Sequence, residues 1–195
     1  MIGNFAADPG GVIEVEHLIG ANMSFRRAAL EAVGGIRDEY PGTGLREETD
    51  ICLRVQAAGW RLCFAPEAIV HEHAAPHARG ARFDLRYGYY FQRNHTVLLI
   101  RNFGLAAPIT TRFATRLARE LVRAPGAALG AARAGKPLRS ALGPAVRAGV
   151  GVGGLAVGVV AGLGLVLAEL RSVSGGSLAG PGASAGPASP PSPRT

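Results

Sequence analysis

Three acidic residues, Glu47, Glu48 and Asp50, stand close together in the first third of the sequence. A carboxylate held beside a substrate hydroxyl can act as a general base. The same residues also suit the first turn of a helix, where negative side chains interact favourably with the helix dipole. The cluster alone therefore fits helix capping as well as acid–base chemistry, and the surrounding sequence must decide between them.

Two histidines, His71 and His73, follow a strand-like segment at 60–70 that is split at Pro66. Between the acidic cluster and this segment, the apolar pattern at 51–58 predicts a short helix. A helix that begins with carboxylates and a strand that ends in histidines would bring a base and a metal ligand to one edge of a sheet. Ordinary surface histidines at a strand end are the alternative interpretation.

The residues before the cluster predict further elements that would position it. Alternating apolar and polar residues at 12–18 indicate a half-buried strand, and 21–25 is a second extended segment. A short helix is expected at 26–33, ended by Gly34 and Gly35. These elements and the segment after them would form the globular part of the chain.

Aromatic residues recur at helical spacing after residue 82, a pattern more typical of a packed core than of a ligand platform. The two cysteines, Cys52 and Cys63, match no zinc motif and are interpreted as free thiols. Neither feature therefore adds a candidate site.

The net charge of +7 comes mostly from arginines in the second half of the chain. Residues 104–147 predict basic amphipathic helices, which suit a membrane surface. A nucleic-acid partner is not expected, because aromatic residues do not alternate with the arginines and no nucleic-acid module is recognisable. The tail, 169–195, is rich in serine, glycine, proline and alanine and is predicted to be disordered.

Residues 148–168 carry no charge and are long enough to cross a bilayer as a helix. Their alanine and glycine content also fits a helix that lies in the membrane interface. If the helix spans, the arginines before it place the preceding residues in the cytoplasm. Gly154, Gly158 and Gly162 form two overlapping small-xxx-small steps, which predict a helix-packing face.

Four blocks within 12–104 resemble, in order and spacing, the second half of a family 2 glycosyltransferase with the GT-A fold. They read GANMSFRRAALEAVGGI, LREETDICLRVQAAGWRL, PEAIVHEH and RYGYYFQRNHTVLLIRNFG. The resemblance implies an α/β fold, in which residues 1–103 form the acceptor-side half of a Rossmann-like GT-A domain. It implies an inverting hexosyltransferase of surface-polysaccharide type that uses a nucleotide-sugar donor and a glycan or lipid-linked acceptor at the membrane.

The resemblance also implies roles for single residues. The second member of the family's acidic pair is the usual catalytic base, so Glu48 would be the base and Glu47 would orient the loop. The pair is Glu–Glu here where the family has Glu–Asp, which adds one methylene to the base. The residues implied on the substrate side are Asn22, Gly34, Gly35 and Asp50, with Asp50 also capping the helix. His71 and His73 match a position near the metal-diphosphate, where Mg²⁺ or Mn²⁺ is expected.

The sequence lacks the residues that correspond to the first half of the family's domain. The nucleotide-binding region and its DxD metal motif are absent from the chain, so an N-terminally truncated and inactive fragment is expected. The QxxRW motif of processive members is absent as well. The alternative is a non-catalytic, membrane-anchored interaction module derived from such an enzyme.

Overall fold

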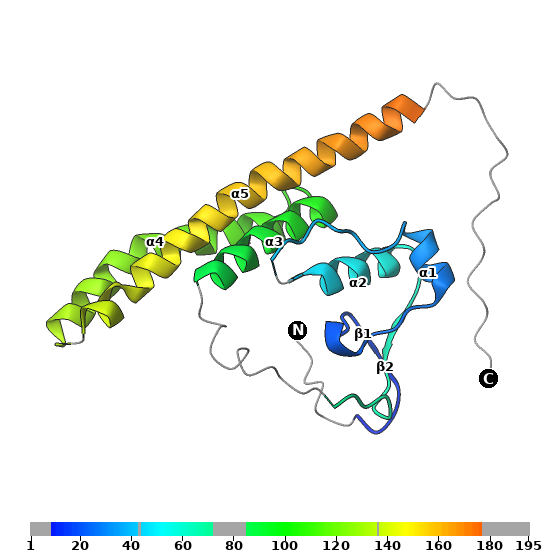
Figure 1. Ribbon diagram of the computed structural model, residues 1–195, viewed down its shortest axis with the longest axis horizontal. Coiled ribbons are helices and arrows are strands. Elements are labelled where there is room, and N and C mark those ends of the chain that lie inside the picture. The colour runs from blue at the N-terminus through cyan, green and yellow to red at the C-terminus, as the bar shows by residue number, and fades with distance from the viewer. Residues whose placement is uncertain (1–8, 43, 72–84, 136, 177–195) are drawn as a thin grey trace. The chain divides into compact units, whose positions relative to one another are not determined.

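The computed structural model describes residues 9–42, 44–71, 85–135 and 137–176, which form two compact units (Figure 1). Among the described residues, the first unit comprises 9–39 and 47–71, and the second comprises 40–46 and 85–176. The domain boundaries expected from the sequence, among them the one at residue 103, stay predictions. The helix before residue 103 belongs with the helices that follow it.

The first unit holds a two-stranded antiparallel sheet. Strand β1 (Ile13–Val15) pairs with β2 (Leu62–Phe64), with Ile13 opposite Phe64 and Val15 opposite Leu62. The expected α/β architecture is confirmed only in part. The sheet that the described residues form has two strands, and most of the described residues are helical.

Two extended segments of the sequence fold differently from the prediction. The segment 21–25 begins within a 3₁₀ turn, η1 (Gly20–Asn22), closed by the Asn22 N–H donating to the Ile19 carbonyl at 3.0 Å. Residues 68–70 are not a strand, because the Ala68 N–H closes a turn onto the Ala65 carbonyl at 3.1 Å after Pro66. Local hydrogen bonds within each segment thus replace the pairing that a strand would need.

Both helices of the first unit end as their glycines predict. Helix α1 (Arg27–Ala32) is followed by Gly34 at φ 71°, and α2 (Glu47–Ala57) by Gly59 at φ 85°. The Trp60 N–H bonds the Val55 carbonyl and the Gly59 N–H bonds the Gln56 carbonyl, the paired bonds of a Schellman motif.

The core of the first unit lies between these helices and the sheet. Its buried residues come from α1, α2 and β2, and they are Ala29, Ile51, Cys52, Val55 and Leu62. Phe25, Trp60 and Val15 pack around them. The side of α2 that carries Ile51 and Val55 is thus fixed by packing, which sets the direction in which the acidic first turn faces.

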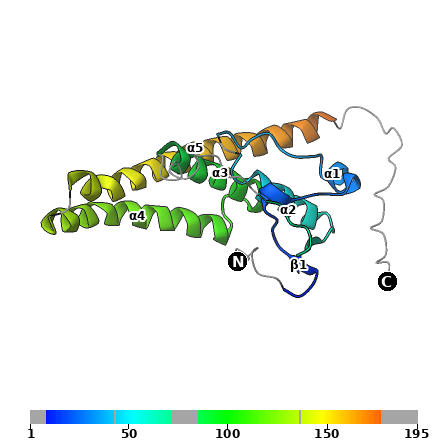
Figure 2. The ribbon, with the colours of Figure 1, turned by 60° about the horizontal axis from the view of Figure 1, so that its bottom comes forward.

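The second unit is built from three long helices that lie side by side: α3 (Leu85–Phe103), α4 (Pro108–Arg133) and α5 (Leu138–Gly176) (Figures 1 and 2). Leu99 of α3, Phe113 and Leu117 of α4 and Leu155 of α5 form its core. Two half-buried aromatic residues of α3 also make packing contacts, since the Tyr90 ring lies against Gly42 and the Phe91 ring stacks on the His95 ring. These contacts agree with the packing role that the helical spacing predicts.

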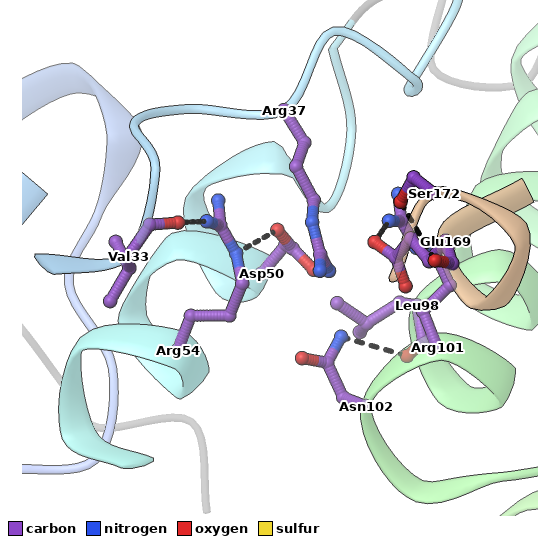
Figure 3. A network of polar contacts seen from close by, with 9 residues as sticks. All are labelled: Val33, Arg37, Asp50, Arg54, Leu98, Arg101, Asn102, Glu169 and Ser172. Carbon is purple, nitrogen blue, oxygen red and sulfur yellow. Dashed lines mark hydrogen bonds and ion pairs between the residues drawn. The ribbon is translucent and has the colours of Figure 1, made fainter. Parts of the chain in front are cut away.

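Helix α5 is longer than the uncharged segment at 148–168, because it continues to Gly176. Residues 169–176, expected in the disordered tail, are helical, and 177–195 lie outside the described residues. Glu169 forms an ion pair with Arg101 of α3 (Figure 3). This contact fastens α5 to α3 beyond the uncharged segment.

Among the described helices, α5 has one stretch, Leu142–Ser172, that is long and apolar enough to cross a membrane. Large apolar side chains on it are exposed to solvent, including Val160 at 74 % and Leu167 at 53 %. Length, composition and this exposure favour membrane association of the second unit.

The predicted glycine face of α5 is confirmed as the surface that packs on α3. A Cβ atom at Gly158 would lie 2.6 Å from the Thr96 Cβ and 2.7 Å from the Arg93 carbonyl oxygen. At Gly154 it would lie 2.7 Å from the Tyr89 carbonyl oxygen. The two backbones approach this closely only because these positions have no side chain.

We expect Gly158→Ala to destabilise the protein by about 1–3 kcal/mol, because the added methyl group overlaps the Arg93 carbonyl oxygen and the Thr96 Cβ of α3, which cannot move without shifting the backbone. Gly164→Ala is the matched control, since a Cβ there meets no atom within 4 Å. That control should be neutral or stabilising by up to about 1 kcal/mol, from helix propensity. Urea unfolding of both variants measures the difference, and equal effects would contradict the packing face.

A half-buried histidine packs between aromatic rings of the second unit. The His95 ring lies 4.6 Å from the Phe113 ring and 6.2 Å from the Phe91 ring, measured between centroids. Burial lowers the pKa of His95 to about 4, with further lowering by the positive charges of Arg46 and Arg116. The imidazole is therefore neutral at physiological pH.

This shift predicts a pH-dependent stability. Because the pKa of His95 is about 4 in the folded state and near 6.5 when unfolded, the unfolded chain binds the proton more readily. The contribution of His95 to the free energy of unfolding is therefore fully present above pH 6.5. It decreases as the pH falls toward 4, by at most about 3 kcal/mol. His95→Phe keeps the aromatic packing and removes the titration. Unfolding at pH 7.5 and pH 5 should show a smaller pH effect in the variant, and an unchanged one would contradict the assignment.

Candidate functional site

The acidic pair opens helix α2, as the sequence predicts. Glu47 and Glu48 are its first two residues, and both side chains are half-buried. The side chain of Glu48 packs against η1, because a Cβ built at Gly20 would lie 3.6 Å from the Glu48 Cβ. The structure therefore brings the predicted base next to the segment that carries Asn22.

The pKa of Cys52, one helical turn after Glu48, is affected by the charge of Glu48. Burial raises the pKa of the Cys52 thiol, a hydrogen bond with the Leu18 backbone lowers it, and the negative charge of Glu48 raises it again. The thiol is thus a neutral, buried group. Cys52 is therefore part of the core of the first unit.

Asp50, the third acidic residue, is 1 % exposed and lies at the centre of a polar cluster (Figure 3). Its Oδ2 accepts a hydrogen bond from Arg54 Nε at 2.8 Å, and its Oδ1 accepts one from Arg37 Nη1 at 3.2 Å. Arg54 Nη1 also donates to the Val33 carbonyl at 2.7 Å. This arrangement ties α2 to the end of α1, which favours a structural role for Asp50 over the expected substrate contact.

Asn22 lies at an exposed position in η1, where its Nδ2 donates to the Ala68 carbonyl at 2.6 Å. A cavity of about 390 Å³ lies between η1 and the segment after β2. Asn22, Ser24, Cys63 and Ala68 contribute to its lining. This cavity contains a predicted substrate-binding residue, Asn22, whereas Glu48 does not line it.

The remaining predicted residues are placed as follows. Gly34 and Gly35, with φ values of 71° and 79°, form the turn that ends α1. His71 is exposed after β2, and His73 lies outside the described residues. In the described part of the chain, no group of three or more His, Cys, Asp or Glu side chains could hold a metal ion. The expected Mg²⁺ or Mn²⁺, with His71 and His73 beside it, stays a prediction.

The loop before Glu47 is held by residues that no sequence pattern singles out. Asn94 of α3 is fully buried, and its Nδ2 donates to the Pro41 and Leu45 carbonyls, both at 3.1 Å. Gly42 lies against the Tyr90 ring, where a Cβ would come within 2.7 Å of ring carbons. The proline and the glycine of this loop indicated a turn in the sequence. They did not indicate its contacts, because Tyr90 and Asn94 of α3 are distant in sequence.

The last residue of this loop has an unusual backbone conformation. Arg46 has a φ of 83°, which is rare for a residue with a side chain. Its guanidinium lies 4.6 Å from the centroid of the Phe91 ring, a cation–π contact that stabilises this conformation. Strain of this kind is concentrated at functional sites, and here it immediately precedes the acidic pair.

Residues 2–126 match the family model described as glycosyl transferase family group 2. The match spans more than half of the chain. The chain belongs to this family. No curated protein and no solved structure matches it in the same comparisons.

The family match confirms the resemblance seen in the four sequence blocks and extends beyond them into α4. It supports a glycosyltransferase, with a nucleotide-sugar and an acceptor as substrates. Both the acidic pair and the η1 segment of this glycosyltransferase lie inside the matched residues, whereas α5 lies after them.

Proposed function

We propose that the protein is an inverting glycosyltransferase in which Glu48 is the general base. The observation that carries the proposal is the position of Glu48 in a chain of this family. It stands in the first turn of α2, half-buried, with its side chain against η1. Of the three acidic residues, Asp50 is engaged by two arginines, which leaves the acidic pair for chemistry.

In the proposed reaction the acceptor hydroxyl transfers its proton to the Glu48 carboxylate as its oxygen attacks the anomeric carbon of the donor sugar. The new carbon–oxygen bond forms on the face opposite the diphosphate. The bond to the diphosphate breaks, and its electron pair leaves with the nucleoside diphosphate. The configuration at the anomeric carbon is therefore inverted. Glu47 orients the loop, and no step is assigned to a metal ion.

The acceptor we propose is a glycan or a lipid-linked molecule at a membrane. The apolar, exposed side of α5 and the arginines of α4 support this location. Arginines on the N-terminal side of α5 favour a cytoplasmic position for the acidic pair. Asn22 and the turn at Gly34 and Gly35 are proposed to face the acceptor.

The test uses protein purified through a C-terminal tag from the membranes of the cells that make it. A panel of nucleotide-sugars is supplied with extracted lipids and glycans, with Mg²⁺ or Mn²⁺ and without them. Release of nucleoside diphosphate together with a product of inverted anomeric configuration supports the proposal. A product of retained configuration would overturn it. If the protein binds another protein but transfers no sugar from any donor, the alternative of a non-catalytic interaction module would be favoured.

A further inference from the structure

A cavity of about 460 Å³ lies among the three helices of the second unit. Most of its wall is apolar, with Leu85 from α3, Leu117 and Ala124 from α4, and Val150 from α5. Neither the acidic pair nor η1 contributes to it. It is therefore separate from the residues assigned to glycosyl transfer.

Two arginines from different helices line this apolar cavity: Arg123 from α4 and Arg147 from α5. Among the described side chains, neither arginine has an ion-pair partner. Glu120 also lines the cavity, but its carboxylate lies 3.2 Å from Arg116 Nε, which balances its charge. The cavity thus combines an apolar wall with uncompensated positive charge.

A third polar group in the wall also lacks a partner. Gln92 of α3 lines the cavity, and its buried Oε1 makes no hydrogen bond within the described structure. A buried amide oxygen without a donor is costly, about 1–3 kcal/mol. A ligand that brings a hydroxyl group to this position would satisfy it.

We propose that this cavity binds the phosphoryl head group of an anionic membrane lipid. The phosphate oxygens accept hydrogen bonds from the guanidinium groups of Arg123 and Arg147. The Gln92 amide bonds a hydroxyl of the head group, and the acyl chains lie along the apolar wall. Leu142 and Val146, next to Arg147 on α5, are 47 % and 45 % exposed, so the cavity lies beside an apolar surface that suits a bilayer.

The experiment compares two double variants of the full chain that lose the same net charge. Arg123→Gln/Arg147→Gln changes the cavity, whereas Arg112→Gln/Arg119→Gln changes exposed arginines of α4 that do not line it. Binding is measured by flotation with phosphatidylcholine vesicles, with and without phosphatidylglycerol. Circular dichroism checks that both variants keep their helices.

The cavity variant should lose affinity for the phosphatidylglycerol vesicles by about tenfold more than the control, as expected for loss of charge-assisted hydrogen bonds. Equal losses in both variants would overturn the proposal, because they indicate a general basic surface. Binding that does not depend on phosphatidylglycerol would overturn it too.

A second arm distinguishes the lipid from free phosphate. Inorganic phosphate and a short-chain, soluble phosphatidylglycerol are each titrated against the vesicle-bound protein. Displacement by the short-chain lipid at a much lower concentration supports the lipid site. Equal displacement by inorganic phosphate would overturn the lipid assignment. Both readouts are independent of sugar transfer, so their result leaves the proposed activity unaffected.

Discussion

Glu48→Gln is expected to lower turnover by about 10²- to 10⁴-fold, the usual contribution of a positioned general base. The glutamine keeps the length and shape of the side chain, so its packing against Gly20 is preserved. It cannot accept the proton of the acceptor hydroxyl as a carboxylate does. Steady-state rates with saturating donor and acceptor should therefore show a loss in kcat with little change in KM.

Two further variants separate chemistry from structure. Glu48→Asp restores the carboxylate in the length that the family usually has, and should retain much more activity than Glu48→Gln. Glu31→Gln, an exposed position on α1, should leave the rate unchanged. A fully active Glu48→Gln enzyme would exclude Glu48 as the base.

Asp50→Asn is expected to reduce the free energy of unfolding by about 3–5 kcal/mol, the range for a buried ion pair that loses one partner. The substitution keeps the volume of the side chain and removes its charge. Arg54, whose side chain is 11 % exposed, then carries a positive charge that the buried carboxylate no longer balances. The contact that joins α2 to Val33 at the end of α1 should loosen as a result.

Urea unfolding at constant pH measures this loss as a lower midpoint with an unchanged slope. Asp38→Asn is the matched control, because Asp38 lies nearby in sequence but is exposed, and its effect should stay within about 0.5 kcal/mol. Similar stabilities for the two variants would mean that the Asp50 cluster is not a significant anchor of α2.

These two predictions assign different tasks to neighbouring acids. Glu48 should affect the rate with little effect on stability, and Asp50 should affect stability first. If the Asp50 variant instead lost activity and the Glu48 variant lost stability, the roles assigned to the two carboxylates would have to be exchanged. The comparison is informative because both residues lie in the first turn of the same helix.

Local features of the fold could be predicted from the sequence. The acidic first turn and Gly59 predicted where α2 begins and ends, and Gly34 and Gly35 predicted the end of α1. These predictions are confirmed because helix capping and left-handed turns depend on a few adjacent residues. The glycines of α5 predicted its packing face for the same reason: their spacing alone creates a groove. The four sequence blocks also indicated the family that the comparison then found.

Which of the predicted residues contact one another could not be predicted from the sequence, because it depends on the tertiary structure. Asp50 became an anchor because Arg37 and Arg54 converge on it, and no local pattern announces that pairing. Asn94 holds the Pro41 and Leu45 carbonyls across a long stretch of chain, and Arg123 and Arg147 line one cavity from two helices. Such contacts depend on packing between distant segments, whose free energy is spread over many residues and leaves little signal in any one of them.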